Sequence, residues 1–190
     1  FTNLTDDHLD YHGTLENYLK AKKKFFDQLP SDAFALTNID DKNGRIMLQN
    51  TGATKKTYGL KSDADFKCRI LENQFEGLQL IIDGQELWCN LIGKFNAYNL
   101  LAVYSAAILL GERKPEVLTA LSTVNAVEGR FDFIRSDNNI VGIIDYAHSP
   151  DALNNVLSTI AAIRTKNETL ITVVGAGGDR DKLKRPLMGK

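Results

Sequence analysis

The sequence predicts an α/β protein, with a mixed sheet and helices in its first part and a parallel α/β unit at its end. Three observations support this fold class. Apolar residues recur with helical periodicity at residues 14–29 and 95–110, short apolar runs and turn residues alternate between these helices, and residues 140–174 follow a strand, helix, strand pattern. The change of pattern after residue 128 predicts two domains, at residues 1–128 and 129–190.

In the first domain, Thr14 is the predicted N-cap of the first long helix, because its hydroxyl can accept a hydrogen bond from the first turn. Residues 33–39 predict a short buried strand. Gly111 ends the second long helix, and residues 115–124 predict another helix. An antiparallel meander is predicted from three apolar runs separated by glycine-containing turns, at residues 66–71, 78–82 and 87–92.

The second domain begins with predicted strands at residues 131–134 and 140–144. Ser149 is a predicted N-cap, and the proline that follows it favours the first turn of a helix that extends to about residue 163. The wholly apolar segment at residues 170–174 predicts a buried strand that leads into a glycine-rich turn. Two continuous apolar strands joined by a helix are typical of a parallel sheet.

The composition is that of an ordinary folded protein and excludes several classes. The chain has 190 residues, of which 43% are hydrophobic and 25% are charged, and its formal net charge is −1. A charge near zero argues against a broad nucleic-acid surface, and no apolar run reaches the roughly 20 residues that span a bilayer. Cys68 and Cys89 are too few for a disulfide framework, which favours a reducing cytoplasm. The lack of an N-terminal methionine suggests a piece of a longer protein.

Lys22 differs from the other lysines of the basic run at residues 20–24 in its position on the predicted helix. At about 100° per residue, Lys20 and Lys24 lie opposite the apolar stripe, whereas Lys22 lies at its centre. The side chains within about 60° of it are Leu15, Tyr18, Phe25, Phe26 and Leu29. An unpaired ammonium is costly there. Either the side chain extends to solvent or to an ion pair, or the amine is neutral and able to take up carbon dioxide.

His8 and His12 lie four residues apart in an acidic segment that also contains three aspartates. The spacing would place both imidazoles on one face of a helix, but Leu9 occupies the position where zinc proteases have a glutamate. Carboxylate oxygens favour Mg²⁺ over a structural zinc ion. The segment is therefore either a magnesium site or a polar loop that caps the neighbouring backbone.

Asn96 and Asn99 lie in the first turns of the second long helix and are neighbours on one face. An amide side chain can present a donor and an acceptor together to the edge of a purine. Helix capping accounts for Asn96 but leaves Asn99 unexplained. The pair is therefore a candidate site for a nucleotide base.

Further candidates follow the predicted strands of the second domain. Asp145 and His148 come after the strand at residues 140–144, at the edge where open parallel sheets bind ligands. Solvation of the strand end is the alternative for Asp145. Arg180 follows a glycine-rich turn that could hold an anion. Because Arg180 occupies the position of the third glycine of the pattern GxGxxG, the dinucleotide motif is excluded.

Six segments together resemble the Mur ligase family, and within it the MurE branch. They occur in the order of the family, at residues 2–13, 18–22, 93–99, 129–130, 145–153 and 177–189. The resemblance implies a partial Mur-ligase central ATPase domain followed by the start of a Rossmann-like C-terminal domain. It also implies a cytoplasmic, ATP-dependent ligase that adds an amino acid to UDP-MurNAc-L-Ala-D-Glu through an acyl phosphate, in peptidoglycan precursor synthesis.

The resemblance also implies roles for residues of the first domain. Lys22 matches a carbamylated lysine that helps to hold Mg²⁺ near the phosphates of ATP, and His8 matches a ligand of a second Mg²⁺. Asn96 and Asn99 match asparagines beside the adenine base. These roles agree with the position of Lys22 on the apolar stripe and with the amide chemistry of the asparagine pair.

In the second domain, Arg130 and Asp145 match residues that hold the nucleotide. Arg180 matches an arginine near the incoming amino acid, and His148 lies in the same cleft and is a further catalytic candidate. The implied partners are the UDP-MurNAc-dipeptide and an amino acid, either diaminopimelate or lysine. Binding to nucleic acid and insertion into a membrane are not expected, and a monomer is expected.

The sequence departs from the family pattern in one large respect, since the ATP-binding P-loop, GxxGK[ST], is absent from residues 1–190. We therefore expect these residues alone to be inactive and to bind ATP poorly. Two alternatives remain for the function. One is a ligase like folylpolyglutamate synthase, which shares the carbamylated lysine, and the other is a non-catalytic nucleotide-binding module derived from a ligase.

Overall fold

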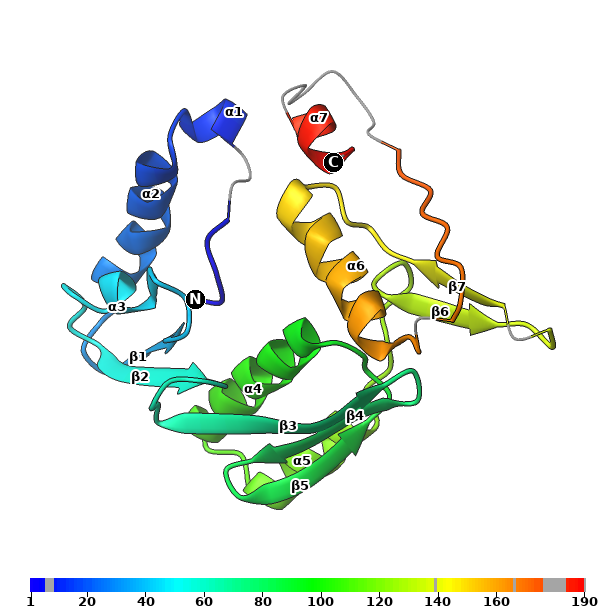
Figure 1. The fold of residues 1–190 in the computed structure, drawn as a ribbon. Coiled ribbons are helices and arrows are strands. Elements are labelled where there is room, and N and C mark those ends of the chain that lie inside the picture. Colours follow the sequence, from blue (N-terminus) through cyan, green and yellow to red (C-terminus); the bar gives the residue numbers. More distant parts are fainter. Residues whose placement is uncertain (6–8, 139, 166, 176–183, 190) are drawn as a thin grey trace. The chain divides into compact units, whose positions relative to one another are not determined.

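The computed structural model of the chain describes residues 1–5, 9–138, 140–165, 167–175 and 184–189. The chain divides into two compact units, Phe1–Val124 and Asn125–Lys190. The first unit (Figure 1) contains α1 (Leu9–His12), α2 (Leu15–Asp27), β1 (Phe34–Asn38), α3 (Gly44–Met47), β2 (Thr54–Gly59), β3 (Phe66–Gln74), β4 (Gly77–Ile82), β5 (Gln85–Cys89), α4 (Lys94–Leu109) and α5 (Lys114–Ser122). The second contains β6 (Asp132–Arg135), β7 (Val141–Ile144), α6 (Pro150–Ile163) and α7 (Lys184–Met188).

The first unit is built on a five-stranded mixed sheet in the order β1-β2-β3-β4-β5. β1, β2 and β3 are parallel, whereas β3, β4 and β5 form the predicted antiparallel meander. Leu78, Leu80 and Ile82 of β4 are fully buried, and α4 packs across β1 to β4 while α5 packs on α4 and β5 (Figure 1). The mixed sheet with helices that the sequence predicts is therefore confirmed.

The sequence does not point to β2, although this strand lies between β1 and β3. Its segment contains the adjacent polar residues Lys55 and Lys56, and Tyr58 is its only large apolar side chain. The apolar pattern of a buried strand is therefore weak here. Pairing on both sides, rather than local sequence, makes this segment a strand.

The first long helix begins as predicted, since the Thr14 hydroxyl accepts a hydrogen bond from the backbone N–H of Asn17 at 3.2 Å. Its apolar stripe is narrower than predicted. Phe26 is buried in a core cluster that also includes Leu19 and Leu29, but Phe25 is 65% exposed. The buried face is thus rotated away from Phe25, and the centre of the stripe lies toward Leu19 and Phe26.

The second unit contains an antiparallel hairpin of β6 and β7, followed by α6. The hydroxyl of Ser149 accepts a hydrogen bond from the backbone N–H of Ala152 at 3.3 Å, which confirms the predicted N-cap of α6. Asp145 and the other polar residues of the segment between β7 and α6 thus lie between a paired strand and a capped helix.

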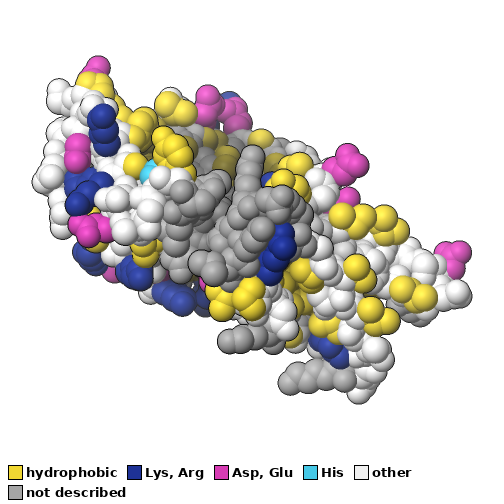
Figure 2. Space-filling model, turned by 90° about the horizontal axis from the view of Figure 1, so that it is seen from above, with side chains coloured by type: hydrophobic (Ala, Val, Ile, Leu, Met, Phe, Trp, Pro, Cys, Tyr) yellow, Lys and Arg dark blue, Asp and Glu magenta, His cyan; other side chains and the backbone are white. Residues whose placement is uncertain are grey.

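The predicted strand at residues 170–174 is not formed, so the described residues do not form the parallel strand, helix, strand unit predicted for the end of the chain. In the described part of the second unit these residues pair with no other strand, and Ile171 and Val173 are 81% and 94% exposed. A strand depends on hydrogen bonds to its neighbours, and within the described residues β6 and β7 pair only with each other. A hairpin and one further apolar segment are too few strands to form a sheet that buries both of its faces. Hydrophobic side chains also reach the surface at several places on the face drawn in Figure 2.

Among the described residues, no helix is both long enough and apolar enough to cross a membrane.

The turn from β3 into β4 offers a test of the first unit. At Gly77, φ is +141°, and an added Cβ would lie 2.1 Å from the carbonyl oxygen of Cys89. We expect Gly77→Ala to lower the free energy of unfolding by roughly 3 kcal/mol or more, because strain and a backbone clash add. Gly84→Ala is the matched control, since φ is +83° but nothing lies within 4 Å. Equal losses in urea unfolding of both variants would contradict this packing.

Candidate functional site

Lys22 lies within α2 and is partly buried, with Nζ 4.9 Å from the centroid of the Tyr18 ring. The same ring stacks on His12, with 4.6 Å between the two centroids. A row of three side chains therefore connects the acidic segment before α2 with the lysine. A cation over an aromatic face is stabilised by the ring quadrupole.

The lysines beside Lys22 on the helix are arranged differently. Lys20 and Lys23 each form an ion pair with a carboxylate four residues away on α2. Within the described residues, no carboxylate pairs with Lys22. The ion-pair explanation for its place near the apolar face therefore finds no support there, whereas a modified amine and a cation over an aromatic ring remain compatible with the geometry.

The predicted asparagine pair is brought together on α4 in a defined orientation. Asn96 Nδ2 donates to the carbonyl oxygen of Ile92 at 2.8 Å, and Asn99 Nδ2 donates to Asn96 Oδ1 at 3.2 Å. A backbone carbonyl only accepts, so the Asn96 amide must present its oxygen to Asn99. The exposed Asn99 therefore keeps Oδ1 as an acceptor and one N–H as a donor, which is the pattern that reads an adenine edge.

Arg130 and Asp145 lie close to each other in the second unit. Asp145 Oδ2 accepts a hydrogen bond at 2.7 Å from the backbone N–H of Phe131, the residue that follows Arg130. Phe131 has a φ of +49°, which is rare for a bulky residue, and its side chain is buried. The carboxylate of Asp145 thus holds the turn that presents Arg130, while the Arg130 side chain itself is exposed.

Tyr146 joins the remaining candidates of this unit. The guanidinium carbon of Arg130 lies 4.5 Å from the centroid of the Tyr146 ring, and the His148 ring lies 5.3 Å from it. His148 Nδ1 also contacts the backbone oxygen of Tyr146 at 3.1 Å. Tyr146 is 63% exposed and was not among the predicted site residues. Its place between Asp145 and His148 in the same motif is the signal that could have identified it.

His8 and Arg180 lie outside the described residues, so the structure does not place them. Among the described residues, no group of three or more His, Cys, Asp and Glu side chains could hold a metal ion. A cavity of about 650 Å³ lies next to the β2–β3 loop, but the predicted site residues do not line it. Lysines and aspartates both line this cavity, so charges of neither sign predominate there.

Asp40, in the turn after β1, was also missed by the sequence prediction. Its Oδ2 accepts hydrogen bonds from the backbone N–H groups of Leu60 and Lys61 at 2.7 and 2.9 Å and from the Tyr98 hydroxyl at 2.8 Å. Its Oδ1 accepts from the backbone N–H of Ser62 at 2.8 Å. Burial raises the pKa of Asp40, but these hydrogen bonds lower it more and hold the pKa below its ordinary range.

A prediction on pH follows from Asp40. Because its pKa is lower in the folded state than the unfolded value of about 3.9, its contribution to stability is complete above the unfolded pKa and is lost as the pH falls below it. We expect Asp40→Asn to lower the thermal midpoint at neutral pH and to weaken its dependence on acid pH. Asp32→Asn, in an exposed loop, is the control. An unchanged acid profile in Asp40→Asn would contradict the assignment.

Two family models match the chain. The Mur ligase middle domain matches residues 1–107, and the Mur ligase, glutamate ligase domain matches residues 129–190. The chain is 62% identical over 190 residues to a UDP-N-acetylmuramoyl-L-alanyl-D-glutamate--2,6-diaminopimelate ligase of Parabacteroides distasonis, with 100% of this chain and 39% of that protein covered. The enzyme of the same name from Halalkalibacterium halodurans is 41% identical over 197 residues, with 100% and 40% covered. The chain therefore spans less than half the length of these curated relatives.

Solved structures agree with these matches. The structure of another UDP-N-acetylmuramoyl-L-alanyl-D-glutamate--2,6-diaminopimelate ligase aligns with a TM-score of 0.70 at 35% identity and covers 98% of this chain and 39% of that one. MurF ligase from Thermotoga maritima, in complex with ADP, aligns with a TM-score of 0.71 at 18% identity over 84% of this chain and 38% of its own, so it shares the fold. The fold class and the resemblance predicted from the sequence are confirmed, and the chain belongs to the Mur ligase family.

Proposed function

We propose that the full-length protein that carries this chain is an ATP-dependent ligase that joins an amino acid to the D-glutamate of UDP-MurNAc-L-Ala-D-Glu. The observation that carries this proposal is the 62% identity, over the whole chain, to a ligase whose name specifies that substrate. Because the three ligases described above that are more than 30% identical to this chain are named for 2,6-diaminopimelate, we propose diaminopimelate rather than lysine as the added amino acid.

The proposed reaction has two steps. An oxygen of the D-glutamate carboxylate attacks the γ-phosphorus of ATP, ADP leaves, and an acyl phosphate forms. The amine of the amino acid then attacks the acyl carbon, and inorganic phosphate leaves with the oxygen that came from the carboxylate. The protein must exclude water until the amine attacks, because water would hydrolyse the acyl phosphate.

Each unit carries residues that are able to contact a nucleotide. Asn99 presents an acceptor and a donor in the pattern of an adenine edge, and Asn96 fixes that orientation. Arg130 is exposed beside the carboxylate of Asp145, and a guanidinium there can form charge-assisted hydrogen bonds with phosphate or ribose oxygens. Residues 1–190 contain no P-loop, so they supply no backbone cradle for the β- and γ-phosphates.

Lys22 is the described residue that best fits a role near Mg²⁺. An ammonium cannot ligate a cation, but a carbamate on Nζ would supply two hard oxygens of the kind Mg²⁺ prefers. Its partly buried site without a paired carboxylate within the described residues suits that modification, and His8 is a second proposed ligand. When bound, Mg²⁺ would neutralise charge on the transferring phosphoryl group.

Arg180 and His148 are proposed to act on the acceptor side. An arginine can hold the carboxylate of the incoming amino acid by a bidentate contact, and an imidazole can accept a proton from its amine near neutral pH. The exposed position of the His148 ring beside Tyr146 is compatible with that role. We further propose a cytoplasmic location, where the nucleotide-linked substrate and ATP are available.

Release of ADP by the full-length protein tests the proposal. We expect release with ATP and UDP-MurNAc-L-Ala-D-Glu to require diaminopimelate, and lysine to replace it poorly. Release with a folate in place of the UDP-linked substrate would favour a ligase like folylpolyglutamate synthase. No release with either substrate would favour a non-catalytic nucleotide-binding module.

A further inference from the structure

Asp40 connects three segments of the first unit that are distant in the sequence. It follows β1, it accepts three backbone N–H groups from residues 60–62 after β2, and it accepts the hydroxyl of Tyr98 from α4. An added Cβ at Gly59 would lie 3.2 Å from the Asp40 carboxylate, so the loop approaches the carboxylate closely. The Asp40 carboxylate thus accepts four hydrogen bonds, which fix its position.

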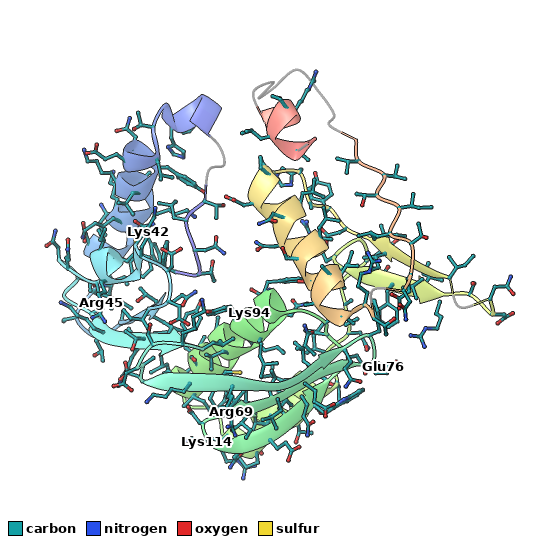
Figure 3. All side chains as sticks on the ribbon, viewed as in Figure 1. Lys42, Arg45, Arg69, Glu76, Lys94 and Lys114 are labelled. Atoms are coloured by element: carbon teal, nitrogen blue, oxygen red, sulfur yellow. The ribbon has the colours of Figure 1, made fainter. Side chains whose placement is uncertain are left out.

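Tyr98 connects the fixed Asp40 carboxylate to the part of α4 that contains the asparagine pair. It lies on α4 between Asn96 and Asn99, in the helical turns that follow Lys94, which Figure 3 labels at the start of the helix. Its hydroxyl donates to Asp40 Oδ2 at 2.8 Å across 58 residues of sequence. A hydrogen bond to an ionised acceptor is stronger and more directional than a neutral one.

The start of α4 has a second attachment of a different kind. Asn73, at the end of β3, accepts a hydrogen bond through Oδ1 from the backbone N–H of Gly93 at 2.9 Å. That contact fixes where the helix begins, but not its rotation about its own axis. The bond from Tyr98 to Asp40 lies off the axis and, together with the packing of α4 on the sheet, holds the direction in which the face with Asn99 points.

We propose that Asp40 and Tyr98 are positioning residues that orient the Asn96 and Asn99 amides for the adenine base. This inference rests on the proposed function, because it assumes that Asn99 reads the nucleotide. A binding group must be held within about 0.5 Å of its productive position. Loss of the Tyr98 hydroxyl would loosen the first turns of α4 and would weaken the distinction between adenine and guanine, whose oxygen at the same edge cannot donate to Asn99 Oδ1.

The same helix supplies a matched control. Tyr104 lies further along α4 and is buried. Tyr104→Phe and Tyr98→Phe therefore remove the same atom from the same helix, but only Tyr98→Phe removes a hydrogen bond to Asp40. Only Tyr98 lies in the turns that carry the asparagine pair. A purely structural role would give both variants the same effect.

The test measures kcat/KM of the full-length protein for ATP and for GTP, together with the thermal midpoint. In Tyr98→Phe we expect KM for ATP to rise about tenfold with kcat nearly unchanged, since the contact serves binding, and we expect the preference for ATP over GTP to fall. Tyr104→Phe should keep the wild-type preference even if its thermal midpoint falls. An unchanged preference in Tyr98→Phe, or an equal fall in both variants, overturns the inference.

Failure of the proposed function gives a different result. If the wild-type protein forms no ligation product, the proposed function is contradicted, and the inference is tested by calorimetric dissociation constants for ATP and GTP in the same three proteins. A selective loss of ATP affinity in Tyr98→Phe then supports the positioning role. Equal ATP affinities in the two variants overturn it.

Discussion

Lys22→Ala in the full-length protein is expected to abolish ligation, with a loss of at least about a thousandfold in kcat, because electrostatic stabilisation of a transferring phosphoryl group is among the largest catalytic effects. The partly buried Nζ lies against the Tyr18 ring and pairs with no carboxylate within the described residues. The folded protein should be retained, because the side chain lies at the border of the α2 core. Added short carboxylates should restore part of the activity, since they replace the oxygens of the carbamate.

Lys20→Ala is the matched control for this prediction. Lys20 lies on the same helix, is exposed, and pairs with Glu16, so its loss should change ligation little. Mass spectrometry of the wild-type protein in bicarbonate buffer should detect the carbamate on Lys22 and not on Lys20. Wild-type turnover by Lys22→Ala would contradict the carbamate role, and loss of activity without carboxylate rescue would leave only a structural effect on α2.

Arg130→Ala is the second change with a large expected effect, a fall of about a hundredfold in kcat/KM for ATP, because a charge-assisted hydrogen bond to the nucleotide is lost. Its cost in stability should be at most about 1 kcal/mol, the size of an exposed cation–π contact with Tyr146. The measurements are kcat/KM and urea unfolding of the full-length protein. Unchanged kinetics, or a kinetic loss matched by unfolding, would favour a surface role.

Two further variants sharpen this comparison. Arg113→Ala removes an exposed arginine that pairs with Glu116 on α5, and it should leave kcat/KM unchanged. Asp145→Asn should be non-additive with Arg130→Ala in a double-mutant cycle, since Asp145 holds the turn that presents Arg130. Strict additivity would contradict that coupling.

Local signals in the sequence predict much of the fold. The N-caps at Thr14 and Ser149 are found where hydroxyl residues precede helical patterns, and the meander of β3 to β5 follows from glycine turns between apolar runs. Elements that depend on their neighbours were not predicted correctly. β2 is a strand by pairing on both sides, and the apolar segment at residues 170–174 forms no strand without partners.

The candidate site divides in the same way. That Asn96 and Asn99 are neighbours follows from their spacing on one helix. The orientation of the two amides depends on one further group, the carbonyl oxygen of Ile92, which accepts from Asn96. In contrast, the contact between Asp40 and Tyr98 joins residues 58 positions apart. No periodicity or local motif relates such residues, because tertiary packing brings them together.

The fate of the carboxylate oxygen tests the central claim most directly. The full-length protein would be incubated with ATP, diaminopimelate and UDP-MurNAc-L-Ala-D-Glu whose D-glutamate side-chain carboxylate carries the heavy oxygen isotope. An acyl phosphate predicts that the inorganic phosphate released during ligation contains the heavy isotope. Phosphate released without the heavy isotope, while ATP is consumed, would mean that water attacks ATP directly, and it would contradict this account.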